Sequence, residues 1–117
     1  MALPEALRDL LTNHGPSGYE RAPAAVWRRH AEAFAEVEAD TLGSSTARVA
    51  GTAGGPTVAV VGHIDEIGLI VTHVDDKGFA WFTGVGGWDP QVLIGQRVSV
   101  STRDGAVPGV VGRKPIH

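Results

Sequence analysis

The hydrophobic pattern changes its period at Glu36, and this change constrains the fold more than any other feature of the sequence. Before it, leucines recur at three- and four-residue steps, at positions 3, 7, 10 and 11, which is typical of a helix. After it, Val37 and Ala39 alternate with acidic residues, which indicates a strand with one exposed side. The sequence therefore predicts a helical front joined to a β-rich remainder.

A second helix is predicted after the break at residues 13–16. Ser17 and Glu20 have the spacing of a capping box, in which the Ser hydroxyl caps the helix and the Glu side chain reaches back. Pro23 is awkward in such a helix, because proline lacks the N–H and crowds the preceding turn. The helix therefore either begins near Ala22 or bends there. Its apolar face would hold Trp27, Ala31 and Phe34.

Residues 57–61 are continuously apolar and mostly β-branched, which predicts a central strand covered on both faces. Shorter extended runs are expected at 36–40 and 46–50, around a turn at 42–44. Two hairpins are predicted, pairing 69–74 with 79–83 and 96–102 with 106–111 across glycine-containing turns. The glycine-rich stretch 84–90 between them is expected to be a turn. The chain thus divides near Gly68 into an α/β front and an all-β back.

The composition excludes several classes of function. The 117 residues hold 10 Lys and Arg against 13 Asp and Glu, a net charge of −3 without a basic block, which disfavours nucleic-acid and anionic-membrane partners. No apolar run approaches the roughly 20 residues of a membrane span, and no secretory signal pattern opens the sequence. The absence of cysteine rules out disulfides, thiolate zinc sites and a cysteine nucleophile, and it fits a reducing cytoplasm.

One group of residues stands out for chemistry, and it directly follows the predicted central strand: Gly62-His63-Ile64-Asp65-Glu66-Ile67-Gly68. Ligands bind at the carboxyl ends of strands in open α/β sheets. His63 and Asp65 are two apart, so they lie on one side of an extended chain, where the carboxylate can fix the imidazole tautomer for metal binding. A purely structural His–Asp hydrogen bond fits the spacing equally well, since two residues do not complete a zinc site.

The other candidates are weaker. Ser17 is better interpreted as a helix cap than as a nucleophile. His73 is expected to be structural or exposed, His14 to lie in a loop and His30 on a helix surface. The glycines at 84–87 lack the Gly-Lys-Ser/Thr and helix of a phosphate-binding loop, so a turn is favoured. The aromatic residues of the first hairpin predict a barrel core rather than a nucleic-acid stacking surface: Phe79, Trp81 and Phe82.

Taken in order, six stretches resemble the M42 metallo-aminopeptidases, which include the glutamyl and tetrahedral aminopeptidases. These stretches are residues 15–20, 40–43, 62–68, 86–90, 95–98 and 107–112. Each is weak alone, but together, in order and distributed nearly from end to end, they are specific, and the resemblance extends over essentially all 117 residues. Two departures are visible: Ser44 and Ser45 stand where the family commonly has an asparagine, and Pro23 lies inside the second helix.

The resemblance implies a fold and a site. The fold is α/β: residues 1–67 would form the start of a zinc-peptidase catalytic domain, and residues 68–117 part of a barrel-like β insertion used in oligomerisation. The chain would stop before the catalytic domain resumes. By the same resemblance, His63 would bind one of two divalent metal ions, zinc or cobalt, and Asp65 would be the catalytic acid that orients its imidazole. The remaining ligands and the glutamate base would lie downstream.

The resemblance also implies an activity. The intact family enzyme is expected to be a cytoplasmic aminopeptidase that acts on short peptides and assembles into homo-oligomers, commonly dodecamers. Because the chain alone lacks most of the ligands, one alternative is a non-catalytic assembly or regulatory module that uses the β domain. A second alternative is an unrelated small binding domain in which His63 is structural.

Overall fold

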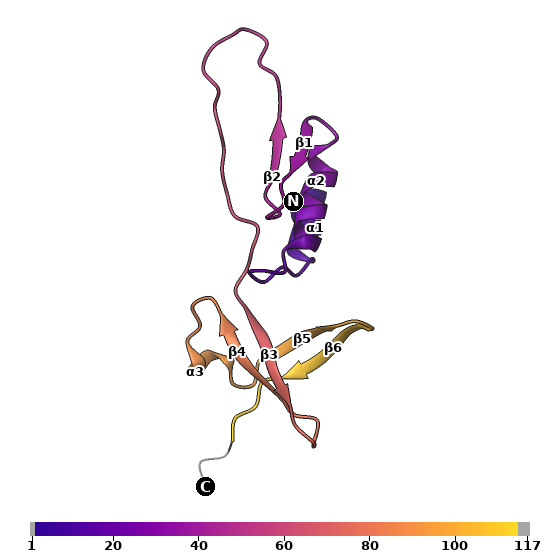
Figure 1. Ribbon diagram of the computed structural model, residues 1–117, viewed down its shortest axis with the longest axis vertical. Coiled ribbons are helices and arrows are strands. Elements are labelled where there is room, and N and C mark those ends of the chain that lie inside the picture. The colour runs from indigo at the N-terminus through magenta and orange to yellow at the C-terminus, as the bar shows by residue number, and fades with distance from the viewer. Residues whose placement is uncertain (1, 115–117) are drawn as a thin grey trace. The chain divides into compact units, whose positions relative to one another are not determined.

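The computed structural model describes residues 2–114 and has a mixed α/β fold. The chain divides into two units, Met1–Gly86 and Gly87–His117. Across the described residues, the strands pair into three separate two-stranded antiparallel sheets, β1–β2, β3–β4 and β5–β6, none of which closes into a barrel (Figure 1). The α/β class predicted from the sequence is therefore confirmed.

The first unit begins with two helices, α1 (Glu5–Leu11) and α2 (Arg21–Ala31), which contact each other. The capping box at Ser17 is not formed, since the N-cap of α2 is Glu20, and the alternative prediction that the helix begins near Ala22 is confirmed, because α2 starts at Arg21. Pro23 consequently falls in the first turn, where a backbone N–H has no helical acceptor, and proline is tolerated there. The helix ends at Ala31, so Phe34 lies beyond it and is 70% exposed rather than part of its apolar face.

The hairpin β1 (Glu36–Ala39) and β2 (Ser45–Arg48) packs against α2. Its turn contains Gly43, whose φ of 97° is in the region that favours glycine. Four apolar residues of α2 are buried in this part of the unit: Pro23, Ala24, Val26 and Ala31. The core beneath the helix is therefore small and made of short side chains.

Residues 57–61 do not form the predicted central strand. They belong to a long connection between β2 and β3 that carries no strand assignment (Figure 1). Val58, Val60 and Val61 are 82%, 98% and 89% exposed. The β-branched sequence favours an extended backbone, but a strand needs a neighbour that supplies hydrogen bonds, and residues 2–114 provide none here.

The first predicted hairpin is confirmed as β3 (Gly68–Val74) and β4 (Ala80–Val85). The strand β4 runs through Gly84 and Val85, which were predicted to belong to a turn, because they pair with Leu69 and Gly68. Its turn includes Gly78, with a φ of 82°. A register irregularity lies between Val71 and His73. The predicted aromatic core is not found among the described residues, since Phe79 and Trp81 remain 67% and 60% exposed.

The second unit contains one helical turn and one hairpin. The strands β5 (Arg97–Thr102) and β6 (Gly105–Val110) confirm the last predicted hairpin. The turn α3 (Pro90–Leu93) was not predicted, although Asp89 and Pro90 are a typical cap and first residue. Asp89 accepts a hydrogen bond from the backbone N–H of Gln91, and Leu93 is buried.

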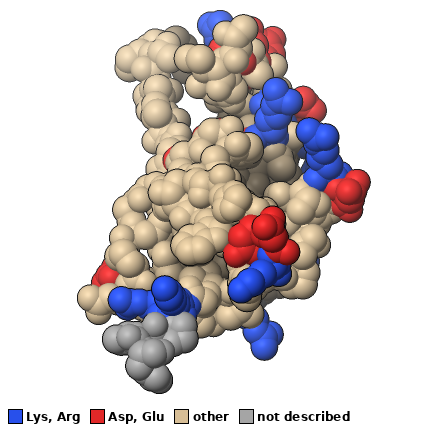
Figure 2. Space-filling view, turned by 60° about the horizontal axis from the view of Figure 1, so that its bottom comes forward, with Lys and Arg blue, Asp and Glu red and all other residues tan. Residues whose placement is uncertain are grey.

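Charged side chains are distributed without a large patch of one sign on the face drawn in Figure 2, where Lys and Arg alternate with Asp and Glu. The helices between residues 2 and 114 are too short or too polar to traverse a lipid bilayer.

Candidate functional site

The segment that carries His63 and Asp65 is tied to the loop before α2 by backbone hydrogen bonds. Pro16 and Glu66 form an isolated parallel bridge. The Ser17 N–H donates to the Glu66 carbonyl at 3.2 Å, and the Glu66 N–H donates to the Gly15 carbonyl at 2.9 Å. The Glu66 carboxylate also accepts from the Gly15 N–H at 2.9 Å. Two loops about 50 residues apart in the chain are thereby joined.

Glycines make this close approach possible. A Cβ atom on Gly68 would lie 2.6 Å from Cβ of Pro16, closer than real side chains come. A Cβ on Gly15 would collide with the ring of Pro23, which places the loop directly against the first turn of α2. We call residues 15–17 together with residues 65–68 the junction. Its close packing requires glycine, which has no side chain, at positions 15 and 68.

Three side chains form a continuous hydrogen-bonded series at this junction: Ser17 and Asp65, which belong to it, and His63, which precedes it in the chain. Nδ1 of His63 lies 2.8 Å from Oδ1 of Asp65 and 3.0 Å from the Asp65 carbonyl oxygen. The Ser17 hydroxyl donates to the other carboxylate oxygen, Oδ2, at 2.5 Å. The two oxygens of one carboxylate thus bind two different partners, a histidine and a serine.

The electrostatics of this series favour an ionised aspartate. The hydrogen bond from Ser17, and to a smaller extent the one from His63, lowers the pKa of Asp65 below the ordinary value of an aspartate. An ionised carboxylate only accepts hydrogen bonds, so Nδ1 of His63 carries the proton that it donates. In the neutral imidazole this leaves Nε2 with a free lone pair. The His63 side chain is 85% exposed, so Nε2 is accessible to a ligand.

Ser17 therefore has a different role from the one predicted. Its hydroxyl does not cap α2 but reaches Asp65 across 48 positions of sequence. Glu20 accepts a hydrogen bond from the Gly18 N–H at 2.6 Å instead of completing a capping box. The spacing of Ser17 and Glu20 suggests a helix cap, and no local pattern in the sequence indicates the contact between Ser17 and Asp65.

The other histidines lie apart from this series. His30 is not simply on a helix surface, because it joins Arg29 in binding the carboxylate of Asp9, with N···O distances of 2.9 and 3.0 Å. The hydrogen bond with His30 has the largest effect in lowering the pKa of Asp9, and the hydrogen bond with Arg29 lowers it further. His14 lies 3.8 Å from the Glu66 carboxylate, and His73 is exposed on β3. The Asp9 cluster connects α1 to α2 and has a structural role.

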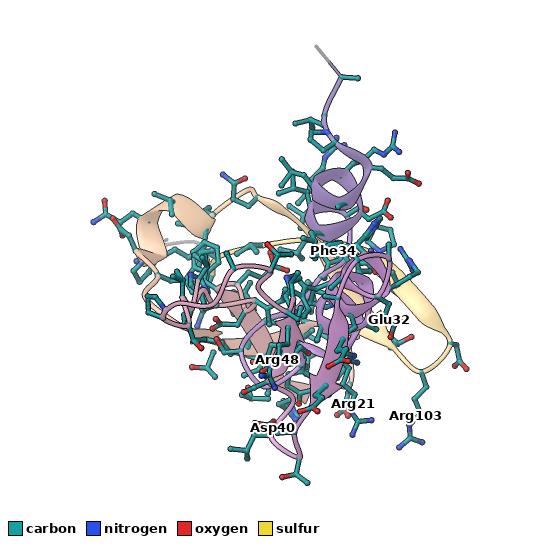
Figure 3. The ribbon with its side chains drawn as sticks, turned by 90° about the horizontal axis from the view of Figure 1, so that it is seen from above. Arg21, Glu32, Phe34, Asp40, Arg48 and Arg103 are labelled. Atoms are coloured by element: carbon teal, nitrogen blue, oxygen red, sulfur yellow. The ribbon has the colours of Figure 1, made fainter. Side chains whose placement is uncertain are left out.

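An open hollow of about 560 Å³ lies elsewhere in the first unit, lined by residues 32–36 and 48–50. Figure 3 labels three of its lining side chains: Glu32 and Phe34, which follow α2 in the chain, and Arg48, the last residue of β2. It contains no histidine. The chemistry of the first unit therefore points to the junction rather than to this hollow.

The donor set at the junction fits one ligand of a metal site. A histidine whose Nδ1–H is held by a carboxylate is the usual arrangement around protein-bound zinc. Across residues 2–114, however, no three His, Cys, Asp or Glu side chains gather closely enough to hold an ion. The described residues therefore supply one oriented imidazole, and a complete site needs further ligands.

The same fold occurs in solved aminopeptidases. The TET aminopeptidase of the Thaumarchaeota archaeon SCGC AB-539-E09 matches 95% of this chain and 31% of its own, with a TM-score of 0.87 and 41% identity. The TET1 peptidase of Pyrococcus horikoshii, described as assembling into a tetrahedron or a large octahedral shell, matches 97% of this chain and 34% of its own, with a TM-score of 0.81 and 34% identity. The fold of the chain is thus similar to that of about a third of each of these aminopeptidases.

The sequence comparisons identify the family. The M42 glutamyl aminopeptidase model matches residues 43–117. The lysyl aminopeptidase of Pyrococcus furiosus is 36% identical over 115 residues, which cover 97% of this chain and 33% of that protein. The chain belongs to the M42 glutamyl aminopeptidase family, as its motifs predicted, and it spans about a third of the length of this curated relative.

Proposed function

We propose that the chain is the N-terminal portion of a metal-dependent aminopeptidase that removes N-terminal residues from short peptides. Membership of the M42 family supports the reaction class. The observation that carries the proposal is the His63–Asp65 pair, in which the carboxylate holds Nδ1 and leaves an exposed Nε2. An imidazole held in this way is prepared to bind a metal ion.

In this proposal His63 is the ligand of one of two divalent ions, zinc or cobalt, and Asp65 is the acid that orients it. Such ions, when bound, polarise the scissile carbonyl and lower the pKa of a water molecule. Asp65 keeps the Nδ1 proton of His63 directed at its own Oδ1, so that the imidazole presents Nε2 in a fixed direction. The remaining ligands and the general base come from outside residues 2–114.

The proposal extends to domains and assembly. Residues 1–67 belong to the catalytic α/β domain, and residues 68–117 to a β insertion that mediates homo-oligomer formation of the dodecamer type. The tetrahedral and octahedral assemblies of the Pyrococcus horikoshii TET1 peptidase support the oligomer. A cytoplasmic location is consistent with a sequence that contains no cysteine.

The test begins by reading the gene beyond the codon for His117 and expressing the whole reading frame. The expected product releases N-terminal residues from short peptides, stops when a chelator removes its metal, and recovers when zinc or cobalt is restored. His63→Ala should reduce the rate more than about 100-fold, because it removes a ligand. His73→Ala is the matched control, since His73 is an exposed histidine on β3, and its rate should stay close to that of the unsubstituted protein.

Two outcomes would contradict the proposal. If His63→Ala retains full activity and metal content, His63 is a structural histidine. If a stop codon follows His117 and the 117-residue product oligomerises without hydrolysing peptides, the chain is an assembly or regulatory module instead.

A further inference from the structure

In the hydrogen-bonded series of His63, Asp65 and Ser17, the proposed reaction gives a role to His63 and to Asp65 but none to Ser17. It lies in the loop before α2, and its only side-chain partner among residues 2–114 is Oδ2 of Asp65. A serine hydroxyl is a poor contributor to burial, and this one does not cap the helix that follows it. Its position must therefore be explained by what it does to Asp65.

The surroundings of His63 do not hold its ring. The side chain is 85% exposed, whereas that of Asp65 is 38% exposed. Among residues 2–114, the hydrogen-bond partners of the imidazole are the carboxylate and the carbonyl oxygen of Asp65. Of these two contacts, the shorter one, to Oδ1 at 2.8 Å, depends on how the Asp65 carboxylate is rotated about its last side-chain bond.

Ser17 limits that rotation, because its own place is fixed. The Ser17 N–H donates to the carbonyl of Glu66, which follows Asp65 in the chain. The N–H of Glu66 in turn donates to the carbonyl of Gly15, two residues before Ser17. The contact between Gly68 and Pro16 closes the junction on the other side. The Ser17 hydroxyl thus donates to Oδ2 of Asp65 from a backbone that is held by hydrogen bonds, and the other carboxylate oxygen, Oδ1, faces His63.

We propose that Ser17 is a positioning residue, whose hydroxyl holds the Asp65 carboxylate so that His63 keeps its proton on Nδ1 and presents Nε2 to an electrophilic ligand. Ser17 itself touches neither the metal nor the substrate. The proposal deepens the function proposed above and rests on it for the identity of the ligand. The arrangement of the three side chains can be tested without that ligand.

The first measurement is the tautomer of the neutral His63 side chain in the metal-free chain, read from the ring nitrogen shifts in ¹⁵N NMR at alkaline pH. The expected result is mostly Nδ1–H in the unsubstituted chain and a shift toward Nε2–H, the form that free histidine prefers, in Ser17→Ala. Ser17→Thr keeps a hydroxyl at the same position and should restore the Nδ1–H form. His73 is the internal control, and its signals should not change.

The same spectra separate positioning from a merely structural role. Backbone amide signals of α2 and β3 report whether the junction survives in Ser17→Ala. An unchanged tautomer in a folded Ser17→Ala chain would overturn the proposal. So would a Ser17→Thr chain that keeps the amide signals of the junction but resembles Ser17→Ala in its tautomer.

The second measurement is the affinity of the whole reading-frame product for Zn²⁺, with Co²⁺ as a spectroscopic probe. Loss of a residue that orients a metal ligand through another side chain weakens metal binding by about 10- to 100-fold, so Ser17→Ala should weaken it about tenfold and Ser17→Thr much less. An unchanged affinity in Ser17→Ala would also overturn the proposal. A third outcome separates the two proposals. If neither the unsubstituted protein nor the variants bind metal, but the His63 tautomer still shifts in Ser17→Ala, the proposed function fails and the positioning role of Ser17 stands.

Discussion

Residues 57–61 and residues 65–68 lie on either side of His63, and they respond to their surroundings in opposite ways. The first segment has the most strand-like sequence of the chain, yet its valines are exposed and it pairs with no strand among residues 2–114. The second segment has a mixed sequence of charged, apolar and glycine residues, yet it is fixed by hydrogen bonds to the loop before α2.

The difference shows that propensity and placement are separate properties. β-branched residues favour an extended backbone, but only a neighbouring strand converts that preference into a sheet. Polar groups and glycines have little preference of their own, but they are placed precisely when a partner lies within hydrogen-bond distance. The part of the chain that carries the candidate chemistry is therefore held by contacts rather than by its own propensity.

The largest effect is expected from Gly68→Ala, which adds a Cβ atom 2.6 Å from the rigid ring of Pro16. It should lower the free energy of unfolding by about 1 to 3 kcal/mol, because the junction must open to admit the methyl group. Urea denaturation followed by circular dichroism measures this change.

The matched control is Gly62→Ala, in the same stretch of chain, where an added Cβ would meet nothing within 4 Å. Its free energy of unfolding should change by less than about 1 kcal/mol. Equal effects of the two substitutions would mean that the junction is not closely packed, and the comparison between the two segments would fail.

A smaller difference is expected between Val60→Lys and Leu69→Lys. Val60 is 98% exposed, so the lysine at this position should change the free energy of unfolding of the chain by less than about 0.5 kcal/mol. Leu69 is half-buried on β3, and its replacement should cost about 1 kcal/mol of lost apolar burial.

Thermal unfolding of the two lysine variants, measured side by side, decides this prediction. A large loss of stability in Val60→Lys would show that residues 57–61 find a partner within the 117 residues. In the whole reading-frame product the order is expected to reverse if segments beyond the chain cover these valines.

The smallest effect concerns the second polar contact between distant residues, the carboxylate of Asp9 with His30 and Arg29. Its pKa is lowered in the folded chain, so this group stabilises the fold above its ordinary pKa, and the contribution is lost as the pH falls through the folded value. Asp9→Asn should therefore lower the melting temperature slightly at about pH 7, and the difference should vanish at about pH 2.

The control for charge alone is Asp76→Asn, at an exposed position in the β3–β4 turn. It should leave the melting temperature nearly unchanged over the same pH range. A difference between Asp9→Asn and the unsubstituted chain that persists in acid would show that the contact depends on shape rather than on ionisation.

Local pattern was enough to predict the elements whose contacts are local. The three hairpins close across short turns, and glycines at positions 43, 78 and 105 have the positive φ that such turns need. The first helix likewise begins directly after Pro4. The single turn α3 had a readable signal in Asp89 and Pro90, but its four residues are too short for hydrophobic periodicity to reveal.

The candidate site was predicted in part, for a related reason. The proximity of His63 to Asp65 follows from their spacing, and the hydrogen bond between them is present. The contact of Ser17 with Asp65 could not be predicted, because it depends on where the backbone of residue 16 meets that of residue 66. The same limitation explains the error at residues 57–61, whose pattern contains no information on whether a partner strand is present.

The bridge between Pro16 and Glu66 has a consequence for the order of folding. It closes a loop of about 50 residues, and such a contact forms later than local ones, because the loss of chain entropy precedes any gain. During synthesis, the helices and the first hairpin can form while the rest of the chain is still being made. Ser17 then meets Asp65 only after the chain has been made as far as residue 68, so the imidazole of His63 becomes ordered later than α1, α2 and the hairpin β1–β2.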